Sequence, residues 1–252
     1  MARLARQQSE HGIYHVILRG NDQKQLFYDD EDRQAFLARV ERYKGECGFM
    51  LYAYCLMGNH IHLLIGERDT GLSVIMKKLT LSYSCWFNDK YDRSGFLYQG
   101  RYKSEPVDDD TYLLSVLRYI HLNPVRVGGR IDSWTSYREY VGKSQLVDTG
   151  FILCLFDPVE EKAKDRFREF MHTPSDDGYT FLEGEAKRQS DDKAIEAIKH
   201  IAGVTTCSAL ADLDKEVRNH VLALLKAEGL TVRQIARLTG INRGIVQRAH
   251  MA

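Results

Sequence analysis

The chain has few cysteines, and they follow no metal-binding or disulfide pattern. There are five of them, at irregular spacings and without a Cys-x-x-Cys pair, so we expect neither a disulfide framework nor a structural zinc site. No apolar run is long enough to cross a bilayer, and the polar, basic N-terminus has no apolar signal region. These absences predict a soluble cytoplasmic protein with no membrane partner.

The sequence also lacks an excess of charge of either sign. Its 252 residues include 35 Lys and Arg and 35 Asp and Glu, which gives a formal net charge of zero. The molecule as a whole is therefore not a basic nucleic-acid binder, and any affinity for DNA must come from local basic clusters. The length predicts a main domain plus something smaller, and the hydrophobic content of 44% is sufficient for a sizeable core.

A histidine pair is the most informative motif that is present. His60 and His62 flank one apolar residue at the start of an apolar run that ends at Ile65. On a strand, alternate side chains face the same way, so the two imidazoles would emerge side by side. Such a pair can bind a divalent metal, although two unrelated polar positions on a solvated face would have the same spacing.

The pattern of apolar residues predicts alternating strands and helices around this motif. Strands are expected at 13–18, 49–57 and 60–65, helices at about 30–45, 72–91 and 110–124, and extended chain at 96–107. The last helix is expected to end at Pro124. This order is that of a ferredoxin-like split βαβ arrangement, an antiparallel sheet with helices packed on one face. We therefore predict an α+β fold with the histidine strand inside the sheet.

The rest of the chain divides into an extension and a C-terminal module. Apolar residues at 151–170 predict an amphipathic helix, and the polar, acidic residues 173–192 are typical of a linker. We therefore expect three parts: a main domain at 1–145, a helical extension with the acidic linker at 146–200, and a small all-α module at 201–252.

The C-terminal module has the pattern of a helix-turn-helix. A helix at 213–227 precedes a capping-box sequence that begins at Thr231, and Asn242 is expected to cap a last helix after a turn at Gly240. Two short helices joined by such a turn are typical of the helix-turn-helix, although a hairpin used only for packing has the same pattern. The last helix would present side chains that reach base edges and phosphates of duplex DNA, namely Asn242, Arg243, Gln247 and Arg248.

A second candidate group lies on the helix expected at 110–124. Tyr119 and Asn123 are four residues apart and therefore share a face. If that face meets the two histidines, a nucleophile and a third metal ligand come to one point. His121 lies about 200° around the helix from Tyr119, so we rank it below Asn123 as a ligand. Spacing alone does not separate this interpretation from a tyrosine that only packs.

Four motifs in a fixed order resemble a known family. They are Arg19-Gly20-Asn21, Leu56 to Leu64, Tyr98 to Lys103 and Arg118 to Arg126, followed by Trp134 and Ser136-Tyr137-Arg138. In this order the sequence resembles the single-tyrosine HUH transposases, and specifically the group associated with repetitive extragenic palindromes (REP). The similarity covers about the first 140 to 170 residues, and the helix-turn-helix looks like an added module.

The resemblance implies roles for individual residues. The metal-binding pair of the family falls on His60 and His62, its catalytic tyrosine on Tyr119, and its polar third ligand on Asn123. Related transposases often have Gln as the third ligand, so that Asn is a shorter substitute. The cofactor implied is Mg²⁺ or Mn²⁺.

The resemblance also implies a reaction and its substrate. The reaction is cleavage and rejoining of single-stranded DNA through a 5′-phosphotyrosine intermediate, at hairpin sequences, in DNA transposition or recombination. The chain would be a transposase or a domesticated transposase. A monomer is favoured, with a dimer that shares active sites as the alternative. No Walker-type loop is present, which agrees with rejoining that needs no nucleotide.

Several side chains in or beside the motifs are candidates for contact with this DNA. Phosphate contact is the functional interpretation of the cations, and ordinary solvated side chains are the alternative. The candidates are Arg19, Asn21, Arg101, Lys103, Arg118 and Arg126.

Two other functions fit the same sequence. In one, the helix-turn-helix makes the protein a DNA-binding regulator or hairpin sensor with a degenerate HUH domain. In the other, the protein is a metal-dependent phosphodiesterase with water as the nucleophile. The metal and tyrosine positions are intact, which favours the transposase over a degenerate HUH domain.

Overall fold

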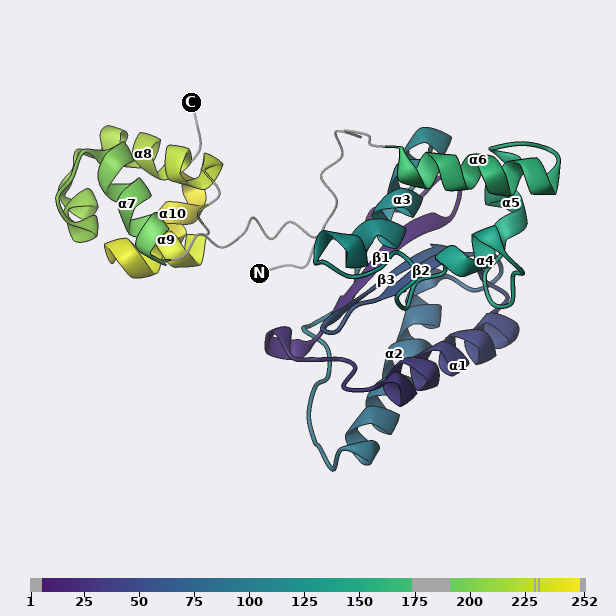
Figure 1. Cartoon of the computed structure of the whole chain (residues 1–252). Coiled ribbons are helices and arrows are strands. Elements are labelled where there is room, and N and C mark those ends of the chain that lie inside the picture. Colours follow the sequence, from purple (N-terminus) through teal and green to yellow (C-terminus); the bar gives the residue numbers. More distant parts are fainter. Residues whose placement is uncertain (1–5, 174–190, 229, 231, 250–252) are drawn as a thin grey trace. The chain divides into compact units, whose positions relative to one another are not determined.

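The computed structural model describes residues 6–173, 191–228, 230 and 232–249 (Figure 1). It divides into two compact units, Met1–Leu182 and Glu183–Ala252. This differs from the three parts expected, because the segment predicted as a separate extension is shared between the two hydrophobic cores. Most of the linker expected at 173–192 lies outside the described residues. In the described parts of the chain, none of the helices combines the length and the hydropathy that a membrane span requires.

A four-stranded antiparallel sheet forms the centre of the first unit. Its strands are β1 (Ile13–Arg19), β2 (Met50–Leu56), β3 (His60–Gly66) and β4 (Lys103–Pro106), in the spatial order β2-β3-β1-β4. The histidine strand β3 is therefore a central strand, as predicted. The extended segment expected at 96–107 forms a strand only over β4. A short 3₁₀ turn, η1 (Asn21–Gln23), follows β1.

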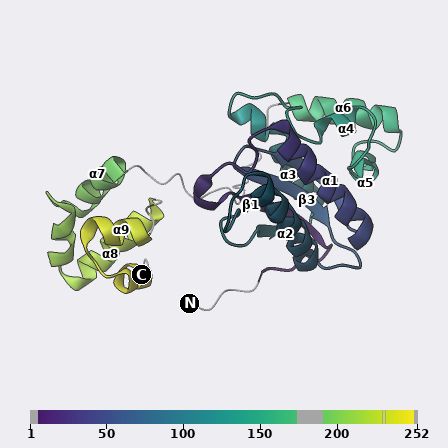
Figure 2. The ribbon, with the colours of Figure 1, turned by 90° about the horizontal axis from the view of Figure 1, so that it is seen from below.

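Two helices cover one face of the sheet. α1 (Asp30–Cys47) and α2 (Leu72–Lys90) lie side by side (Figures 1 and 2). Phe36 of α1 and Tyr83 of α2 pack edge to face with ring centroids 5.2 Å apart, and both are fully buried. α1 ends where Gly48 adopts φ 67°, a conformation that glycine takes without steric cost. The order of the strands with these two helices is the split βαβ topology predicted from the sequence.

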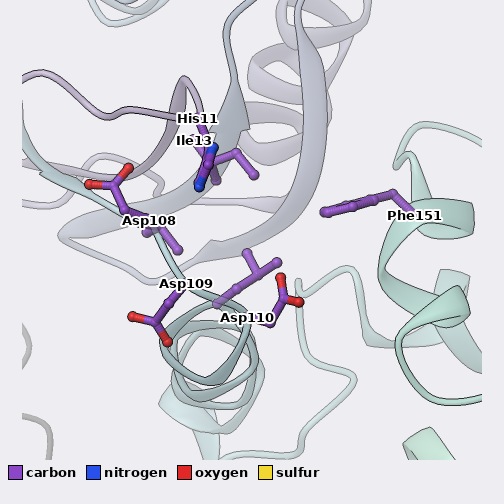
Figure 3. Close-up of a pocket in the computed structure, with 8 residues that line it drawn as sticks. His11, Ile13, Asp108, Asp109, Asp110 and Phe151 are labelled. Carbon is purple, nitrogen blue, oxygen red and sulfur yellow. The ribbon is translucent and has the colours of Figure 1, made fainter.

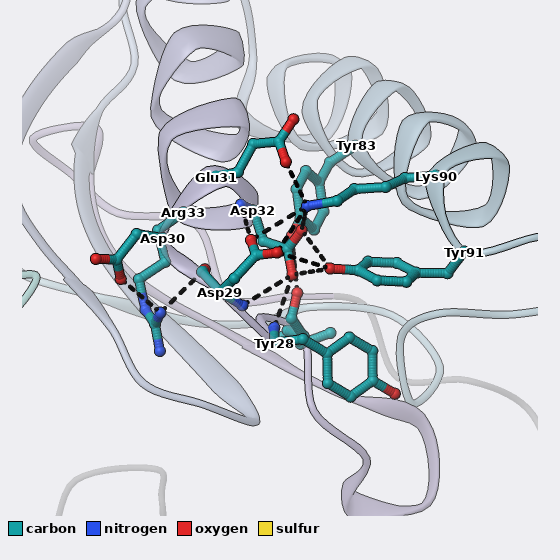
Figure 4. Close-up of polar contacts among 10 residues, drawn as sticks. Tyr28, Asp29, Asp30, Glu31, Asp32, Arg33, Tyr83, Lys90 and Tyr91 are labelled. Atoms are coloured by element: carbon teal, nitrogen blue, oxygen red, sulfur yellow. Dashed lines mark hydrogen bonds and ion pairs between the residues drawn. The ribbon is translucent and has the colours of Figure 1, made fainter.

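A charge cluster around the buried Asp32 joins the start of α1 to the end of α2 (Figure 4). Asp32 is fully buried and forms an ion pair with Lys90 at 2.8 Å. The hydroxyl of Tyr91 and the amide of Tyr28 donate hydrogen bonds to the same carboxylate, at 2.9 Å and 2.7 Å. Glu31 also pairs with Lys90, at 2.9 Å. Because the buried carboxylate is well satisfied, the cluster fixes how the two helices meet.

A third helix, α3 (Asp110–Arg126), lies on the opposite face of the sheet (Figure 1). Helices therefore cover both faces, whereas the sequence predicted one. The side chain of Asp109 accepts a hydrogen bond from the backbone amide of Tyr112 at 2.7 Å and thereby caps the helix. The predicted end at Pro124 is wrong, because proline in the last turn removes only its own N–H from the ladder. The carbonyl of Pro124 accepts from the amides of Val127 and Gly129, which closes the helix after Arg126.

Three shorter helices continue the core beside α3. They are α4 (Tyr137–Val141), α5 (Thr149–Cys154) and α6 (Glu160–His172). The single amphipathic helix expected at 151–170 is therefore two helices, because Pro158 disfavours helical geometry at the residue before it. Tyr140 of α4 stacks on Phe167 of α6 with centroids 4.7 Å apart, and both are buried in the core that contains the sheet.

The second unit is a small helical bundle with its own core. It contains α7 (Asp191–Ala202), a 3₁₀ turn η2 (Cys207–Asp212), α8 (Lys215–Ala227), α9 (Val232–Thr239) and α10 (Arg243–Arg248). Leu222, Ile235 and Val246 are fully buried in it. α7 belongs to this core through Ala194 and Ile198. The capping box predicted at Thr231 begins outside the described residues.

Candidate active site

The two histidines of the motif lie side by side on β3. Arg19 is paired with His60 and Ile17 with His62 across the β1–β3 ladder. The ring centroids of the two imidazoles are 5.1 Å apart, and the rings are nearly perpendicular at 88°. His62 is fully buried, whereas His60 is partly exposed. The alternation of the strand therefore brings both rings to one face, as predicted.

Each of these imidazoles has a polar partner at its Nδ1 atom. Nδ1 of His60 lies 2.8 Å from Oδ1 of Asn59, and since that oxygen only accepts, Nδ1 donates. Nδ1 of His62 lies 2.9 Å from Nε2 of His15, a residue of β1. With Nδ1 occupied in this way, Nε2 is the nitrogen that each ring offers to a metal.

α3 places Tyr119 and Asn123 against the buried histidine. The ring of Tyr119 meets the ring of His62 edge to face, with centroids 5.5 Å apart. Nδ2 of Asn123 lies 3.3 Å from Nε2 of His62. Both α3 residues are buried. The face of the helix predicted to carry a nucleophile and a third ligand is therefore the face that meets β3.

His121 points away from this group, as its position on the helix predicts. Its Nε2 lies 2.8 Å from the hydroxyl oxygen of Ser136, a residue whose hydroxyl also accepts a hydrogen bond from the amide of Tyr54. Burial lowers the pKa of His121 to about 3. The ring is a neutral part of the core and not a further ligand.

The six candidates for DNA contact fall into different environments. The guanidinium carbon of Arg126 lies 4.4 Å from the centroid of the Tyr119 ring. Arg19 is paired with His60, so its side chain lies on the face of the sheet that carries the two histidines, the histidine face. Lys103 is paired with Ile17, which is itself paired with His62, so Lys103 lies on the histidine face as well. The structure therefore brings three of the predicted cations to the side of the sheet that carries the candidate site.

Arg118, Asn21 and Arg101 lie elsewhere. Arg118 is only 7% exposed, and its guanidinium packs on the ring of Phe170, which leaves little surface for a phosphate. Asn21 is exposed in η1, and its amide donates to the carbonyl of Leu97. Arg101 is exposed and lines a separate hollow of about 380 Å³.

The donor set of this group fits a divalent cation that is completed by further ligands. Among the described residues, no cluster of three or more His, Cys, Asp or Glu side chains is arranged to hold a metal. Two imidazole nitrogens and the side-chain oxygen of Asn123 would therefore form an incomplete set. Such a set has room for phosphate oxygens and water.

The candidate site is distinct from the hollow drawn in Figure 3. That hollow, of about 360 Å³, lies at the start of α3. The ring of Phe151 points into it from α5 toward Ile13, whereas Asp108 and Asp109 point away. Asp108 accepts hydrogen bonds from Ser9 and from the amide of Glu10, and Asp109 caps α3. Both carboxylates therefore serve as hydrogen-bond acceptors for neighbouring parts of the chain.

In the second unit, α9 and α10 are joined by a tight turn. Gly240 has φ 74° at this turn, which glycine adopts readily. Oδ1 of Asn242 accepts a hydrogen bond from the amide of Gly244 at 2.8 Å, so Asn242 caps α10 as predicted. Arg243, Gln247 and Arg248 are all exposed. The helices predicted for a helix-turn-helix are present, and the proposed DNA-reading side chains lie on their surface.

His15 is a residue of the site that the sequence analysis did not single out. It lies on β1 between apolar neighbours and is fully buried. Its ring stacks on that of His62 with centroids 5.2 Å apart, and it meets Tyr119 edge to face at 5.9 Å. A lone histidine inside an apolar strand was the available signal, because burial of an imidazole requires a polar partner.

Comparison with known proteins agrees with the motifs. Residues 8–123 match the family described as transposase IS200 like. A Haemophilus influenzae protein described as a REP-associated tyrosine transposase is 29% identical over 143 residues, which span 51% of this chain and 78% of that protein. The family match includes both histidines of β3, Tyr119 and Asn123.

Two solved structures are similar to the chain. A REP-associated tyrosine transposase bound to a REP hairpin aligns over 59% of this chain and 94% of its own, with 15% identity and a TM-score of 0.49. A protein of Deinococcus radiodurans described as a transposase aligns over 51% of this chain and 99% of its own, with 16% identity and a TM-score of 0.35.

Proposed function

We propose that the first unit of this chain, which matches the family described as transposase IS200 like over residues 8–123, cleaves and rejoins single-stranded DNA at REP-like hairpins, with Tyr119 as the nucleophile. The observation that carries this proposal is the contact of Tyr119 and Asn123 with His62. The phenol of Tyr119, the imidazole of His62 and the amide of Asn123 meet there on a strand and a helix. Attack on a bound phosphodiester requires such a fixed placement of the nucleophile beside metal-binding side chains.

In the proposed reaction the phenolic oxygen of Tyr119 forms a bond to the phosphorus of the scissile phosphate. The bond from phosphorus to the 3′ oxygen breaks, the tyrosine gives up its proton, and the leaving oxygen takes one to become a free 3′-hydroxyl. The product is a 5′-phosphotyrosine. Since the new bond is also a phosphoester, the reverse attack by a 3′-hydroxyl rejoins DNA without a nucleotide cofactor.

We propose His60, His62 and Asn123 as the ligands of Mg²⁺ or Mn²⁺. The bound ion would neutralise charge on the phosphate oxygens and make phosphorus a better electrophile. Neighbouring side chains would orient these groups. Asn59 and His15 contact the Nδ1 atoms of the two ligand rings, and Arg126 lies over the ring of Tyr119.

The proposed DNA contacts are those cations that share the histidine face. Arg19, Lys103 and Arg126 would bind phosphates on either side of the scissile bond. Asn21 and Arg101 would contact the strand farther from the centre. Because the nucleophile and the ligand positions of one chain meet each other, a monomer has all the groups that the reaction needs, and we favour it over a dimer.

A second function is proposed for the second unit. The exposed side chains of α10, Arg243, Gln247 and Arg248, would read duplex DNA in the manner of a helix-turn-helix. This activity would direct the chain to its target, and on its own it would make the protein a regulator.

A covalent-adduct assay tests the main proposal. The full chain is incubated with labelled hairpin-bearing single strands and Mn²⁺, and a protein–DNA adduct is sought after denaturation. We expect an adduct with the wild type, none with Tyr119→Phe, and an unchanged yield with Tyr112→Phe, a tyrosine nearer the start of the same helix. If Tyr119→Phe still cleaves the DNA and forms no adduct, the nucleophile is water.

A further inference from the structure

A buried histidine behind the candidate metal ligands has no part in the reaction described so far. His15 lies in the middle of β1 and has no exposed surface. On the β1–β3 ladder, Ile17 is paired with His62, so His15 is the diagonal neighbour of His62 on the same face. The two strands therefore hold the two imidazoles in a fixed relation, independent of any loop.

The hydrogen bonds around His62 have one consistent direction. Nδ2 of Asn123, 3.3 Å from Nε2 of His62, carries protons and can only donate. Nε2 of His62 therefore accepts, and its ring proton is on Nδ1. That proton is donated to Nε2 of His15, 2.9 Å away. His15 is the final acceptor in this series of hydrogen bonds. It keeps the ring proton of His62 on Nδ1 and therefore the lone pair on Nε2.

We propose that His15 is a positioning residue that fixes the tautomer and the ring orientation of His62, so that Nε2 faces a divalent cation. The inference rests on the proposed metal site. His60 has the corresponding arrangement, because Oδ1 of Asn59 accepts from its Nδ1. Each ligand ring is thus held through Nδ1 by a side chain that does not itself bind the metal. Such outer partners commonly change metal affinity by about 10- to 100-fold.

Two substitutions separate hydrogen bonding from packing at this position. His15→Phe keeps an aromatic ring, so that stacking on His62 and the edge contact with Tyr119 are retained. The new side chain has no atom that can accept the hydrogen bond from Nδ1 of His62. In His15→Gln the amide oxygen can still accept from Nδ1 of His62. A purely structural role predicts that Phe is the milder change, whereas the proposed role predicts that Gln is.

The first experiment reads the tautomer of His62 directly and needs no metal. Long-range ¹H–¹⁵N correlation spectra of the full chain distinguish an Nδ1–H ring from an Nε2–H ring, and His62→Ala assigns the signals. We expect Nδ1–H for His62 in the wild type and in His15→Gln, and a shift toward Nε2–H in His15→Phe. A wild-type His62 that carries its proton on Nε2 would overturn the inference.

The second experiment measures Mn²⁺ binding to the full chain by electron paramagnetic resonance, with circular dichroism as the control for folding. We expect His15→Phe to weaken binding about 10- to 100-fold, His15→Gln to stay close to the wild type, and His62→Ala to abolish specific binding. Wild-type affinity in folded His15→Phe, with binding lost in His62→Ala, would refute the role of His15 while leaving the metal site intact. A wild type that binds no Mn²⁺, with or without hairpin DNA, would refute the metal site and this inference with it.

Discussion

The guanidinium carbon of Arg118 lies 3.6 Å from the centroid of the Phe170 ring, and its Nη2 donates to the carbonyl of Phe170 at 2.9 Å. These two contacts tie α6 to the helix that carries Tyr119. Arg118 lies in a motif that resembles a family of DNA-binding proteins, but its guanidinium is used in contacts within the protein. Stability and DNA affinity should separate at this position.

We predict that Arg118→Ala lowers the free energy of unfolding of the first unit by about 1–3 kcal/mol, through loss of a buried hydrogen bond and a cation–π contact. Urea denaturation measures this. The salt dependence of hairpin affinity should not change, whereas in Lys103→Ala its slope should fall by about 0.7 for one lost phosphate contact to a single strand. A fall of the slope in Arg118→Ala would show that this guanidinium contacts DNA.

His60→Ala should abolish adduct formation with little loss of stability, because the side chain is partly exposed. His62→Ala should abolish the adduct too, but with a larger loss of stability, since it removes a fully buried ring that contacts both His15 and Asn123. Thermal melting beside the adduct assay distinguishes the two. An adduct formed by His60→Ala at the wild-type rate would disprove its assignment as a ligand.

Asp32→Ala should destabilise the first unit by about 3 kcal/mol, because it removes a fully buried carboxylate and leaves the hydroxyl of Tyr91 and the amide of Tyr28 without that acceptor. Glu31→Ala removes another carboxylate that pairs with Lys90, but one whose side chain is 70% exposed, and it should change stability much less. Chemical denaturation of both variants measures the difference. Equal losses would mean that burial of Asp32 does not control the α1–α2 contact.

Burial raises the pKa of Tyr54 from 10.0 to about 12. The folded state therefore favours the neutral phenol, and its contribution to stability is complete below pH 10 and is lost as the pH rises from 10 to 12. In Tyr54→Phe the decrease in unfolding free energy over this interval should be smaller than in the wild type. Denaturant titrations at several alkaline pH values test this, and parallel curves for the two proteins would be evidence against it.

The combined substitution Arg243→Ala with Gln247→Ala should weaken duplex binding at least tenfold, because each base-edge contact contributes about 1–3 kcal/mol. Adduct formation on an isolated hairpin should be unchanged, since that reaction is assigned to the first unit. Lys215→Ala, an exposed cation at the start of α8, is the matched control. Electrophoretic mobility shift with duplex DNA gives the readout, and unchanged affinity in the double variant would contradict a DNA-reading α10.

Local sequence patterns predicted most of the elements of the first unit. The apolar runs of β1 and β3 and the helical spacing of apolar residues in α1 and α2 depend on neighbours along the chain, and the topology follows from their order. The family suggested by four ordered motifs agrees with the match of residues 8–123 to the family described as transposase IS200 like. The end of α3 was not predicted, because the last turn of a helix tolerates Pro124. The division of residues 146–200 between two cores was not predicted, because it depends on packing between segments far apart in the chain.

The candidate site residues His60, His62, Tyr119 and Asn123 came from the sequence by itself. Their spacing places them in pairs on a strand and on a helix, and the resemblance to a family implies their roles. Only the tertiary structure revealed that His15 contacts His62 across 47 residues and that Arg118 contacts Phe170 across 52. Periodicity describes direction within one element, whereas these contacts arise from strand register and from the docking of helices far apart in the chain. For that reason the sequence determined which side chains are candidates, and the fold decided which of them are held, buried or brought to the site.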